Sequence, residues 1–331
     1  VIALRNFDLG GIPDAPPAGN SWSNTLLALL GSPNVASKRP VFRQYDHQVL
    51  TNTVVTPGAD AAVLRIKGTN KGIALATDGN ARMVYLDPRV GGAMAIAEAA
   101  RNVVCAGARP VAVTDCLNFG NPERPSVYYQ MEHAIQGMSE ACRTLRTPVI
   151  SGNVSLYNES GDQAIYPTPV VGMLGLLEEV AHHCTPGFKT HGDAVYLLGD
   201  DLGQAGAVAN LAGSEYLSHF HSLVAGQPRL DLPLEERLQA LCLDLIQRRV
   251  VKSAHDCADG GLAVALAECC MHAGLGLDAS GLPVTGRADA LLFGETASRI
   301  VVSIPPERSL GLESAARTAN LPYVRVGTVT G

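Results

Sequence analysis

Two polar segments of this chain have the residue types and spacing from which chemistry can be expected. One reads TDCLNFGNPE over residues 114–123, and the other reads SGNVSLYNE over residues 151–159. A magnesium ion prefers oxygen ligands, and a glycine lets a phosphate group approach the backbone closely. The pattern therefore predicts a site for a nucleotide phosphate with a metal ion. Its candidate residues are a carboxylate, a bare backbone unit, an amide and a hydroxyl, at Asp115, Gly152, Asn153 and Ser155.

The elements around these segments should bring them together. Each segment follows a short apolar run that reads as a strand, at residues 110–113 and 148–150, and a helix is predicted between them over residues 127–145. A strand–helix–strand unit with parallel strands is right-handed in nearly all proteins, so both segments should emerge as loops at one edge of a sheet. Ligands of open α/β sheets bind at such edges. Asp115 by itself could equally cap a turn, and its pairing with the second segment favours a ligand.

A third segment, HDCADGG at residues 255–261, leads into a helix predicted over residues 262–272. The N-terminus of a helix attracts anions, and the two glycines would admit a phosphate. A plain turn capped by aspartate explains the same residues as well. Both interpretations stay open at this point.

The composition narrows the class of protein. A chain of 331 residues suggests about two domains, and the net charge of −6 argues against a nucleic-acid partner. We find no apolar run of about 18 residues, so no membrane-spanning helix is expected. The eight cysteines form no Cys-x-x-Cys pair, which favours a reduced, cytoplasmic protein over a disulfide or zinc framework. The chain starts at Val1 without an initiator methionine or a signal-peptide pattern, as a middle piece of a longer polypeptide would.

Strand and helix patterns alternate along the whole chain, which indicates α/β or α+β layers. A Gly- and Pro-rich stretch at residues 10–20 reads as a linker or surface arm, and residues 187–192 read as a boundary. Further helices are predicted near residues 24–30, after Asp87-Pro88 and over 234–248, and further strands over 49–55, 61–66, 72–76, 170–177, 194–198, 250–254, 290–293, 299–304 and 324–329.

The two polar segments resemble the synthetase subunit of phosphoribosylformylglycinamidine synthase. Four shorter motifs extend the resemblance over essentially the whole chain, at residues 43–46 (RQYD), 77–80 (TDGN), 85–88 (YLDP) and 293–295 (FGE). The match is to the second half of that subunit only. In this family the subunit is an internal duplication of a unit like aminoimidazole ribonucleotide synthetase. The resemblance thus implies a linker and N-terminal arm (1–45), an N-terminal half-barrel domain (46–186) and a C-terminal α/β domain (187–331).

The resemblance also implies an activity. The family is a ligase of purine biosynthesis that amidates formylglycinamide ribonucleotide with ATP, Mg²⁺ and ammonia released from glutamine. It implies that Asp115 and Gly152 contact ATP, that Asn153 binds magnesium, and that Ser155 contacts the substrate. The implied partners are the first half of the synthetase subunit, a glutaminase subunit and a small accessory subunit.

This chain departs from the family where the first half carries Lys-x-Glu-x-x-His. The matching positions here are Ala76, Asp78 and Ala81, so we expect no catalytic residue in this half and no turnover by the chain alone. An auxiliary site that holds a magnesium–nucleotide complex without turning it over is still expected. Its candidate residues are Asp78, Asp256 and Glu295.

Two alternatives remain. The chain could be a self-sufficient, homodimeric ATP-dependent synthetase or kinase of the same superfamily, against which the missing Lys-x-Glu-x-x-His counts. It could also be a non-catalytic half that holds a nucleotide only to stabilise an assembly.

Overall fold

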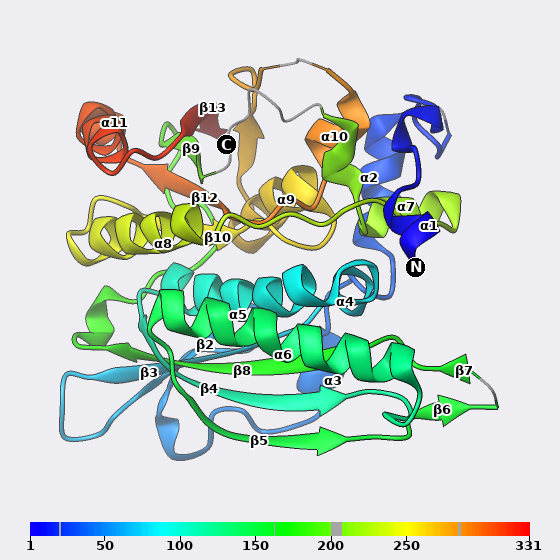
Figure 1. Cartoon of the computed structure of the whole chain (residues 1–331). Helices are drawn as coiled ribbons and strands as arrows, with labels where there is room; N and C mark the ends of the chain where they lie inside the picture. The colour runs from blue at the N-terminus through cyan, green and yellow to red at the C-terminus, as the bar shows by residue number, and fades with distance from the viewer. Residues whose placement is uncertain (20, 162, 200–206, 284–285) are drawn as a thin grey trace.

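The computed structural model describes residues 1–331 except 20, 162, 200–206 and 284–285. Two β-sheets, one from each half of the chain, are separated by a layer of helices (Figure 1). Within the described residues, no helix is long and apolar enough to cross a membrane. The predicted α+β architecture of two successive units is confirmed.

The first sheet has six strands in the order β1-β2-β3-β8-β4-β5. All neighbouring strands are antiparallel except β4 and β5, which are parallel. Helices α5 and α6 cover one face, and among the described residues no helix covers the opposite, bare face (Figure 1). The sheet is therefore the open half-barrel that the sequence predicted. Its strands are β1 (Thr53–Val55), β2 (Ala62–Arg65), β3 (Gly72–Asp78), β4 (Arg109–Asn118), β5 (Val149–Ser155) and β8 (Thr168–Leu177), with a small hairpin of β6 (Glu159–Ser160) and β7 (Gln163–Ala164) at its end.

Local sequence explains the two long helices on this sheet. Helix α5 (Pro88–Cys105) starts where the Asp87 side chain accepts a hydrogen bond from the Val90 amide at 3.2 Å, and proline suits its first turn. Helix α6 (Pro125–Leu145) connects β4 to β5, so the predicted strand–helix–strand unit is confirmed. The two helices pack closely because Gly137 has no side chain: a Cβ there would lie 1.8 Å from the carbonyl oxygen of Arg89. A short helix, α4 (Ala81–Leu86), precedes α5 and was not predicted.

The second sheet has five strands in the order β10-β12-β9-β13-β11, and every neighbouring pair is antiparallel. The central strands β9 and β12 are buried along their whole length. The strands are β9 (Ala194–Gly199), β10 (Ser253–Asp256), β11 (Gly276–Asp278), β12 (Arg299–Ile304) and β13 (Tyr323–Thr330), and the helices around them are α7 (Glu215–His221), α8 (Leu232–Gln247), α9 (Gly261–Ala273), α10 (Ala288–Phe293) and α11 (Ser309–Thr318).

The N-terminal segment packs on the second half of the chain through residues up to Val35, whereas its last helix lies near Gly58 of the first half. It contains α1 (Ile2–Arg5), α2 (Trp22–Leu30) and α3 (Arg39–Phe42). Leu9 and Leu29 are buried in one apolar cluster with Tyr216 and Phe293, so this predicted arm is docked by ordinary core packing.

Several predicted elements need correction. The run Ala290–Phe293 was predicted as a strand and is part of helix α10. Residues 49–51 of the predicted strand 49–55 form a 3₁₀ turn, and only Thr53–Val55 pair as a strand. Short apolar runs fit a buried strand and a buried helix equally well, and their packing decides between them.

Candidate functional site

The parallel pair β4–β5 brings the first set of candidate residues together. In its register Asp115 faces Gly152, Cys116 faces Asn153, and Asn118 faces Ser155. The sequence placed these residues in loops, and that is wrong, because β4 continues to Asn118 and β5 to Ser155. Backbone hydrogen bonds between the two strands thus fix the relative positions of the candidate side chains.

Gly152 is required by the position of Asp115. A Cβ at residue 152 would lie 2.3 Å from Oδ1 of Asp115 and 2.8 Å from its Cγ. The carboxylate therefore lies directly over the bare backbone of Gly152. Partial burial raises the pKa of the Asp115 carboxyl above its ordinary value, so a cation bound beside it would favour the charged form.

The candidate residues lie on two faces of the sheet. Side chains alternate along a strand, so Asp115 and Gly152 share one face while Asn153 and Ser155 share the other. Val113 and Leu117, two residues to either side of Asp115 on β4, pack in the apolar cluster with side chains of α5 and α6, so Asp115 lies on the face toward the helices. Thr114 and Ser151, on the opposite face, are joined by a hydrogen bond of 2.8 Å between their hydroxyls. The four predicted residues are therefore neighbours in the sheet but do not share one face of it.

This edge of the sheet is open. Strand β5 is the last in the sheet, and all its residues except Ser155 are exposed. The bare face and the edge also carry large apolar side chains: Leu75, Ile150 and Val154 are 43%, 66% and 55% exposed. Exposed apolar side chains beside an unpaired strand are typical of a surface that another chain covers.

A second group of polar residues lies between the two halves of the chain. Asp78 ends β3, and its carboxylate accepts a hydrogen bond of 3.0 Å from the Asn102 amide on α5. Burial raises the pKa of Asp78 to about 7. Glu98, one helical turn before Asn102, is the single acidic residue in α5, and burial raises its pKa well above the ordinary value. Glu98 was not among the predicted residues, although a lone carboxylate in an apolar helix is a recognisable signal.

Asp256 of this group is bound by an internal cation. Its oxygens lie 2.6 Å from Nε and 3.3 Å from a terminal nitrogen of Arg101. Arg101 is 1% exposed, and it also contacts Glu235 at 3.0 Å. Ser298 and Gln239 donate further hydrogen bonds to Glu235. This buried network joins α5 of the first half to α8 and β10 of the second.

Glu295 binds backbone groups in the structure. Its Oε1 accepts hydrogen bonds from the amides of Gly260 and Glu215, both at 2.7 Å, at the N-termini of α9 and α7. The sequence allowed two interpretations of the start of α9, a phosphate site and a capped turn. In the structure, the group that binds there is the carboxylate of Glu295. Burial raises the pKa of Glu295 to about 8. Its buried Oε2 accepts no hydrogen bond from the described residues and lies 4.0 Å from a terminal nitrogen of Arg82.

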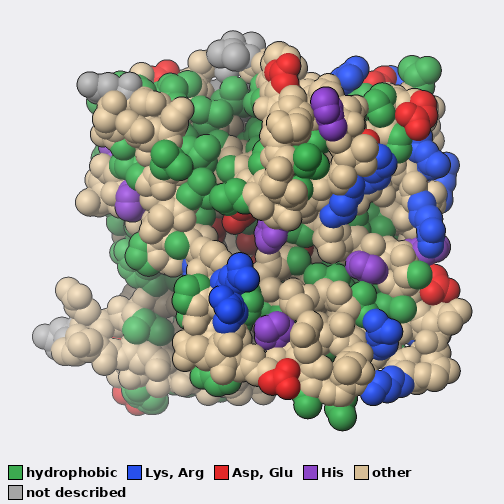
Figure 2. Space-filling model, turned by 180° about the vertical axis from the view of Figure 1, so that it is seen from behind, with side chains coloured by type: hydrophobic (Ala, Val, Ile, Leu, Met, Phe, Trp, Pro, Cys, Tyr) green, Lys and Arg blue, Asp and Glu red, His purple; other side chains and the backbone are tan. Residues whose placement is uncertain are grey.

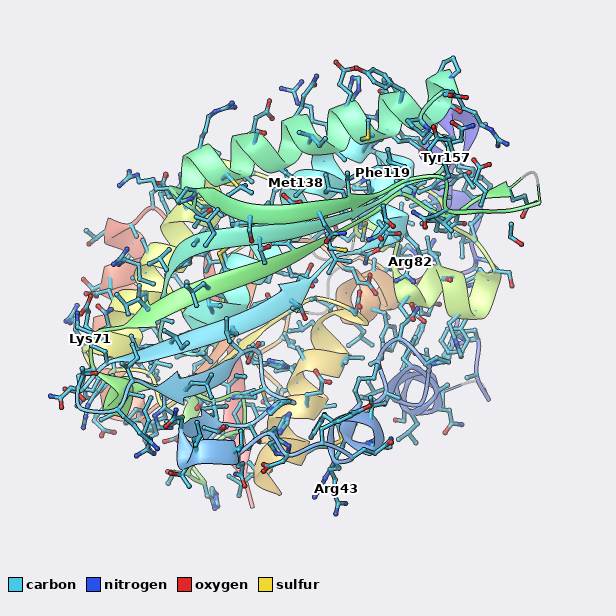
Figure 3. The ribbon with its side chains drawn as sticks, turned by 90° about the horizontal axis from the view of Figure 1, so that it is seen from below. Arg43, Lys71, Arg82, Phe119, Met138 and Tyr157 are labelled. Carbon is cyan, nitrogen blue, oxygen red and sulfur yellow. The ribbon has the colours of Figure 1, made fainter. Side chains whose placement is uncertain are left out.

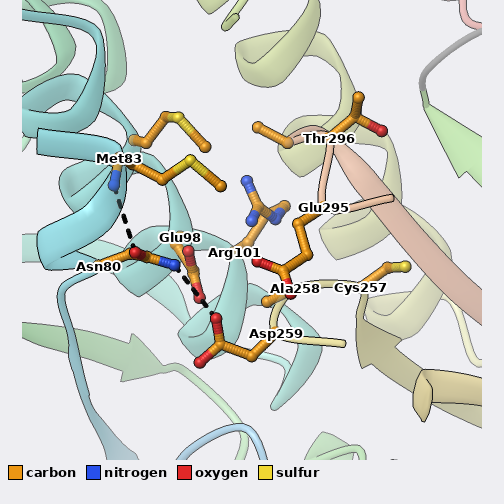
Figure 4. Close-up of a pocket in the computed structure, with 11 residues that line it drawn as sticks. Asn80, Met83, Glu98, Arg101, Cys257, Ala258, Asp259, Glu295 and Thr296 are labelled. Carbon is orange, nitrogen blue, oxygen red and sulfur yellow. Dashed lines mark hydrogen bonds between the residues drawn. The ribbon is translucent and has the colours of Figure 1, made fainter. Parts of the chain in front are cut away.

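These residues line two hollows, and Glu98 and Asp259 belong to the lining of both. Glu98, Asp259 and Glu295 border a cavity of about 20 Å³ (Figure 4), enough for about one water molecule. Asp78, Glu98 and Asp256 also border a groove of about 1300 Å³ with basic residues such as Arg39 and Arg43 at its margin. Figure 2 shows a hollow on this side of the molecule with acidic side chains inside it. The groove is large enough for a nucleotide.

The donor atoms only partly fit magnesium as they now stand. Oxygen donors are the right kind, but Arg101 engages Asp256 and two amides engage Glu295. In the described part of the chain, no three His, Cys, Asp or Glu side chains are arranged to hold a metal ion. The predicted set of Asp78, Asp256 and Glu295 therefore stays a prediction. The charge of Asp78 helps burial to raise the pKa of Glu98, so these two carboxyl groups influence each other.

Comparison with known proteins assigns the family. The N-terminal domain of AIR synthase-related proteins matches residues 58–177, and the C-terminal domain matches residues 190–331. The chain belongs to the AIR synthase-related family. Two curated relatives of this family member are the phosphoribosylformylglycinamidine synthase subunits PurL of Moorella thermoacetica (53% identical over 92% of this chain and 40% of the relative) and Thermomicrobium roseum (52% identical over 99% and 44%). The chain thus spans less than half the length of the curated relatives it matches.

Solved structures agree with this assignment. PurL of Thermotoga maritima complexed with ATP has a TM-score of 0.61 at 25% identity, and the match covers 89% of this chain and 41% of that one. The same protein complexed with FGAR has a TM-score of 0.58 at 25% identity, covering 88% and 39%. A HypE–HypF complex shares the fold alone, with a TM-score of 0.61 at 16% identity over 82% and 87%. The AIR synthase-like architecture predicted from the motifs is confirmed.

Proposed function

We propose that this chain acts as the second half of the synthetase subunit of phosphoribosylformylglycinamidine synthase. In this role it supplies one wall of an active site that amidates formylglycinamide ribonucleotide at the expense of ATP. The first half supplies the other wall, and a glutaminase subunit and a small accessory subunit complete the complex. The cytoplasmic location expected from the sequence remains part of this proposal.

The observation that carries the proposal is the register of β4 and β5. It places the Asp115 carboxylate over Gly152, and the Asn153 amide one residue further on. Both positions lie at the exposed edge of the sheet, where β5 pairs with no further strand among the described residues. Asp115 and Gly152 would contact ATP, Asn153 would bind Mg²⁺ through its amide oxygen, and Ser155 would contact the ribonucleotide. Bound magnesium would neutralise phosphate charge during transfer. The amide and hydroxyl would orient the substrate, because the strand pairing leaves them little freedom.

The groove between the two halves would serve as an auxiliary nucleotide site. Its floor carries Asp78, Glu98 and Asp256, and its margin carries cations that suit phosphate oxygens. Ala76 and Ala81 stand where a lysine and a histidine would be needed for turnover. Glu295 would support this site by holding the start of α9, and a metal there would have to compete with Arg101 for Asp256.

The test uses the purified chain and the assembled enzyme. The chain alone should convert no formylglycinamide ribonucleotide with ATP, Mg²⁺ and ammonia, and adding the first half should restore the activity. Steady-state turnover by the chain alone would instead favour the self-sufficient homodimer.

Variants of Asp115 and Asn153 separate the remaining alternative. In the assembled enzyme, Asp115→Ala and Asn153→Ala should each lower kcat/KM for ATP, and Asn153→Ala should raise the Mg²⁺ concentration needed for half-maximal rate. Unchanged kinetics in both variants would mean that this half only stabilises the assembly.

A further inference from the structure

Tyr157, just beyond β5, has an unusual backbone. Its φ is +59°, in the left-handed region that bulky side chains rarely adopt. Arg146 and Ser222 also have positive φ, but each ends a helix, where that conformation is common. Tyr157 ends no helix. Strain of this kind persists where the surrounding structure enforces it, which is often at a ligand site.

The surroundings do enforce this conformation. The Tyr157 amide donates to the carbonyl of Gly120 at 3.0 Å. The Asn158 side chain donates to the carbonyls of Phe119 and Ser155 at 3.0 and 2.7 Å, and its backbone amide donates to Phe119 at 3.1 Å. The end of β4 therefore holds the turn after β5 from several directions.

The held side chain points away from the core. Phe119, its neighbour across the turn, is 0% exposed, whereas Tyr157 is 59% exposed. Figure 3 shows Tyr157 at the end of the sheet from which the hairpin of β6 and β7 projects. Because the Tyr157 ring is mostly exposed, its burial adds little stability to offset the cost of this backbone conformation.

We infer that Tyr157 is a binding residue for the sugar–phosphate end of the ribonucleotide substrate. This inference rests on the proposed function, in which Ser155, two residues earlier, contacts the same molecule. A tyrosine presents an apolar ring that packs against the ribose and a hydroxyl that can donate to a phosphate oxygen. ATP would lie further back along the strands, at Asp115 and Gly152, so Tyr157 should distinguish the two substrates.

The test compares variants in the full synthetase subunit that carries this sequence as its second half. Tyr157→Asn keeps a residue that tolerates positive φ and removes the ring, so the thermal midpoint should not fall. Its KM for the ribonucleotide should rise about tenfold or more, as loss of one hydrogen bond to a charged group implies, while KM for ATP stays within about twofold. Tyr157→Phe loses the same hydrogen bond but keeps the ring, so its KM for the ribonucleotide should also rise about tenfold, and Tyr157→Asn should exceed it because the ring contact is lost too. Ser222→Gly, at a left-handed position far along the chain, is the control and should leave both KM values unchanged.

Other results would overturn the inference. An unchanged KM for the ribonucleotide in Tyr157→Asn, or an equal rise for ATP, would remove Tyr157 from the substrate site. Failure of the variant subunit to assemble with the other subunits would make Tyr157 a contact between proteins. If the unaltered enzyme itself does not turn over, the proposed function is wrong, and calorimetric titration of the ribonucleotide into the unaltered subunit and Tyr157→Asn would then decide on Tyr157 alone.

Discussion

Replacing Gly152 by alanine should displace Asp115 without unfolding the chain. The new Cβ would lie 2.3 Å from Oδ1 of Asp115. Ordinary contacts between non-bonded atoms are about 3.5 Å, so the carboxylate must move by roughly 1 Å. A shift of about 1 Å in a positioning group can cost about 100-fold in rate, which corresponds to about 2.7 kcal/mol of transition-state stabilisation.

The assay is kcat/KM for ATP in the assembled synthase with ammonia as nitrogen donor, together with the thermal midpoint. Gly152→Ala should lower kcat/KM about 100-fold, and the midpoint should change little because residue 152 lies on an exposed edge strand. Gly311→Ala is the matched control. An added Cβ at residue 311, in α11, has nothing within 4 Å, so this variant should gain up to about 1 kcal/mol of stability and keep its kinetics.

Two results would refute the reasoning behind this prediction. Normal ATP kinetics in Gly152→Ala would mean that the position of Asp115 does not matter for ATP. A fall in thermal midpoint that parallels the loss of rate would mean that the substitution damages the fold, and the close approach of Asp115 to Gly152 would then be structural.

Three further predictions concern stability and assembly. Arg101→Met should lower the free energy of unfolding by about 3–5 kcal/mol, because it leaves two buried carboxylates without their cation, and adding Glu235→Gln should recover part of this loss. Urea unfolding measures both effects, and a change below about 1 kcal/mol would contradict the buried network. Burial lowers the pKa of His221, so the folded chain favours the neutral imidazole. The stability that depends on the neutral imidazole is present above about pH 6.5, the unfolded-state pKa, and is lost as the pH falls through the folded-state pKa. His221→Gln should flatten this acid-side decline in urea midpoints between about pH 7.5 and 5.5, and an identical slope in both proteins would argue against it. Ile150→Lys places a charge on the exposed edge strand and should weaken association with the first half in sedimentation, with no change in thermal midpoint; undiminished association would exclude the β5 edge as the contact.

The amino-acid sequence was enough to predict the strands and the helix that position the site at Asp115 and Gly152. Apolar runs and their spacing predicted β4, α6 and β5, and the right-handed crossover rule placed Asp115 and Gly152 at one edge of the sheet. The rule put them in loops after the strands, whereas they lie within the paired strands themselves. The motifs identified the family because they are long and specific. The run Ala290–Phe293 was assigned wrongly, because four apolar residues carry no period that separates a strand from a helix turn.

Only the tertiary structure decided how the charged residues are used. Asp256 and Glu295 look alike in sequence as free acidic residues, yet one binds Arg101 from a helix in the other half and the other caps two helices. These partners lie 155 and 35 to 80 positions away along the chain, and local periodicity carries no information about contacts at such separations. The same holds for the first site. The sequence by itself determined that Asp115, Gly152, Asn153 and Ser155 gather at one sheet edge, but folding decided that they divide between its two faces, because side chains alternate along paired strands.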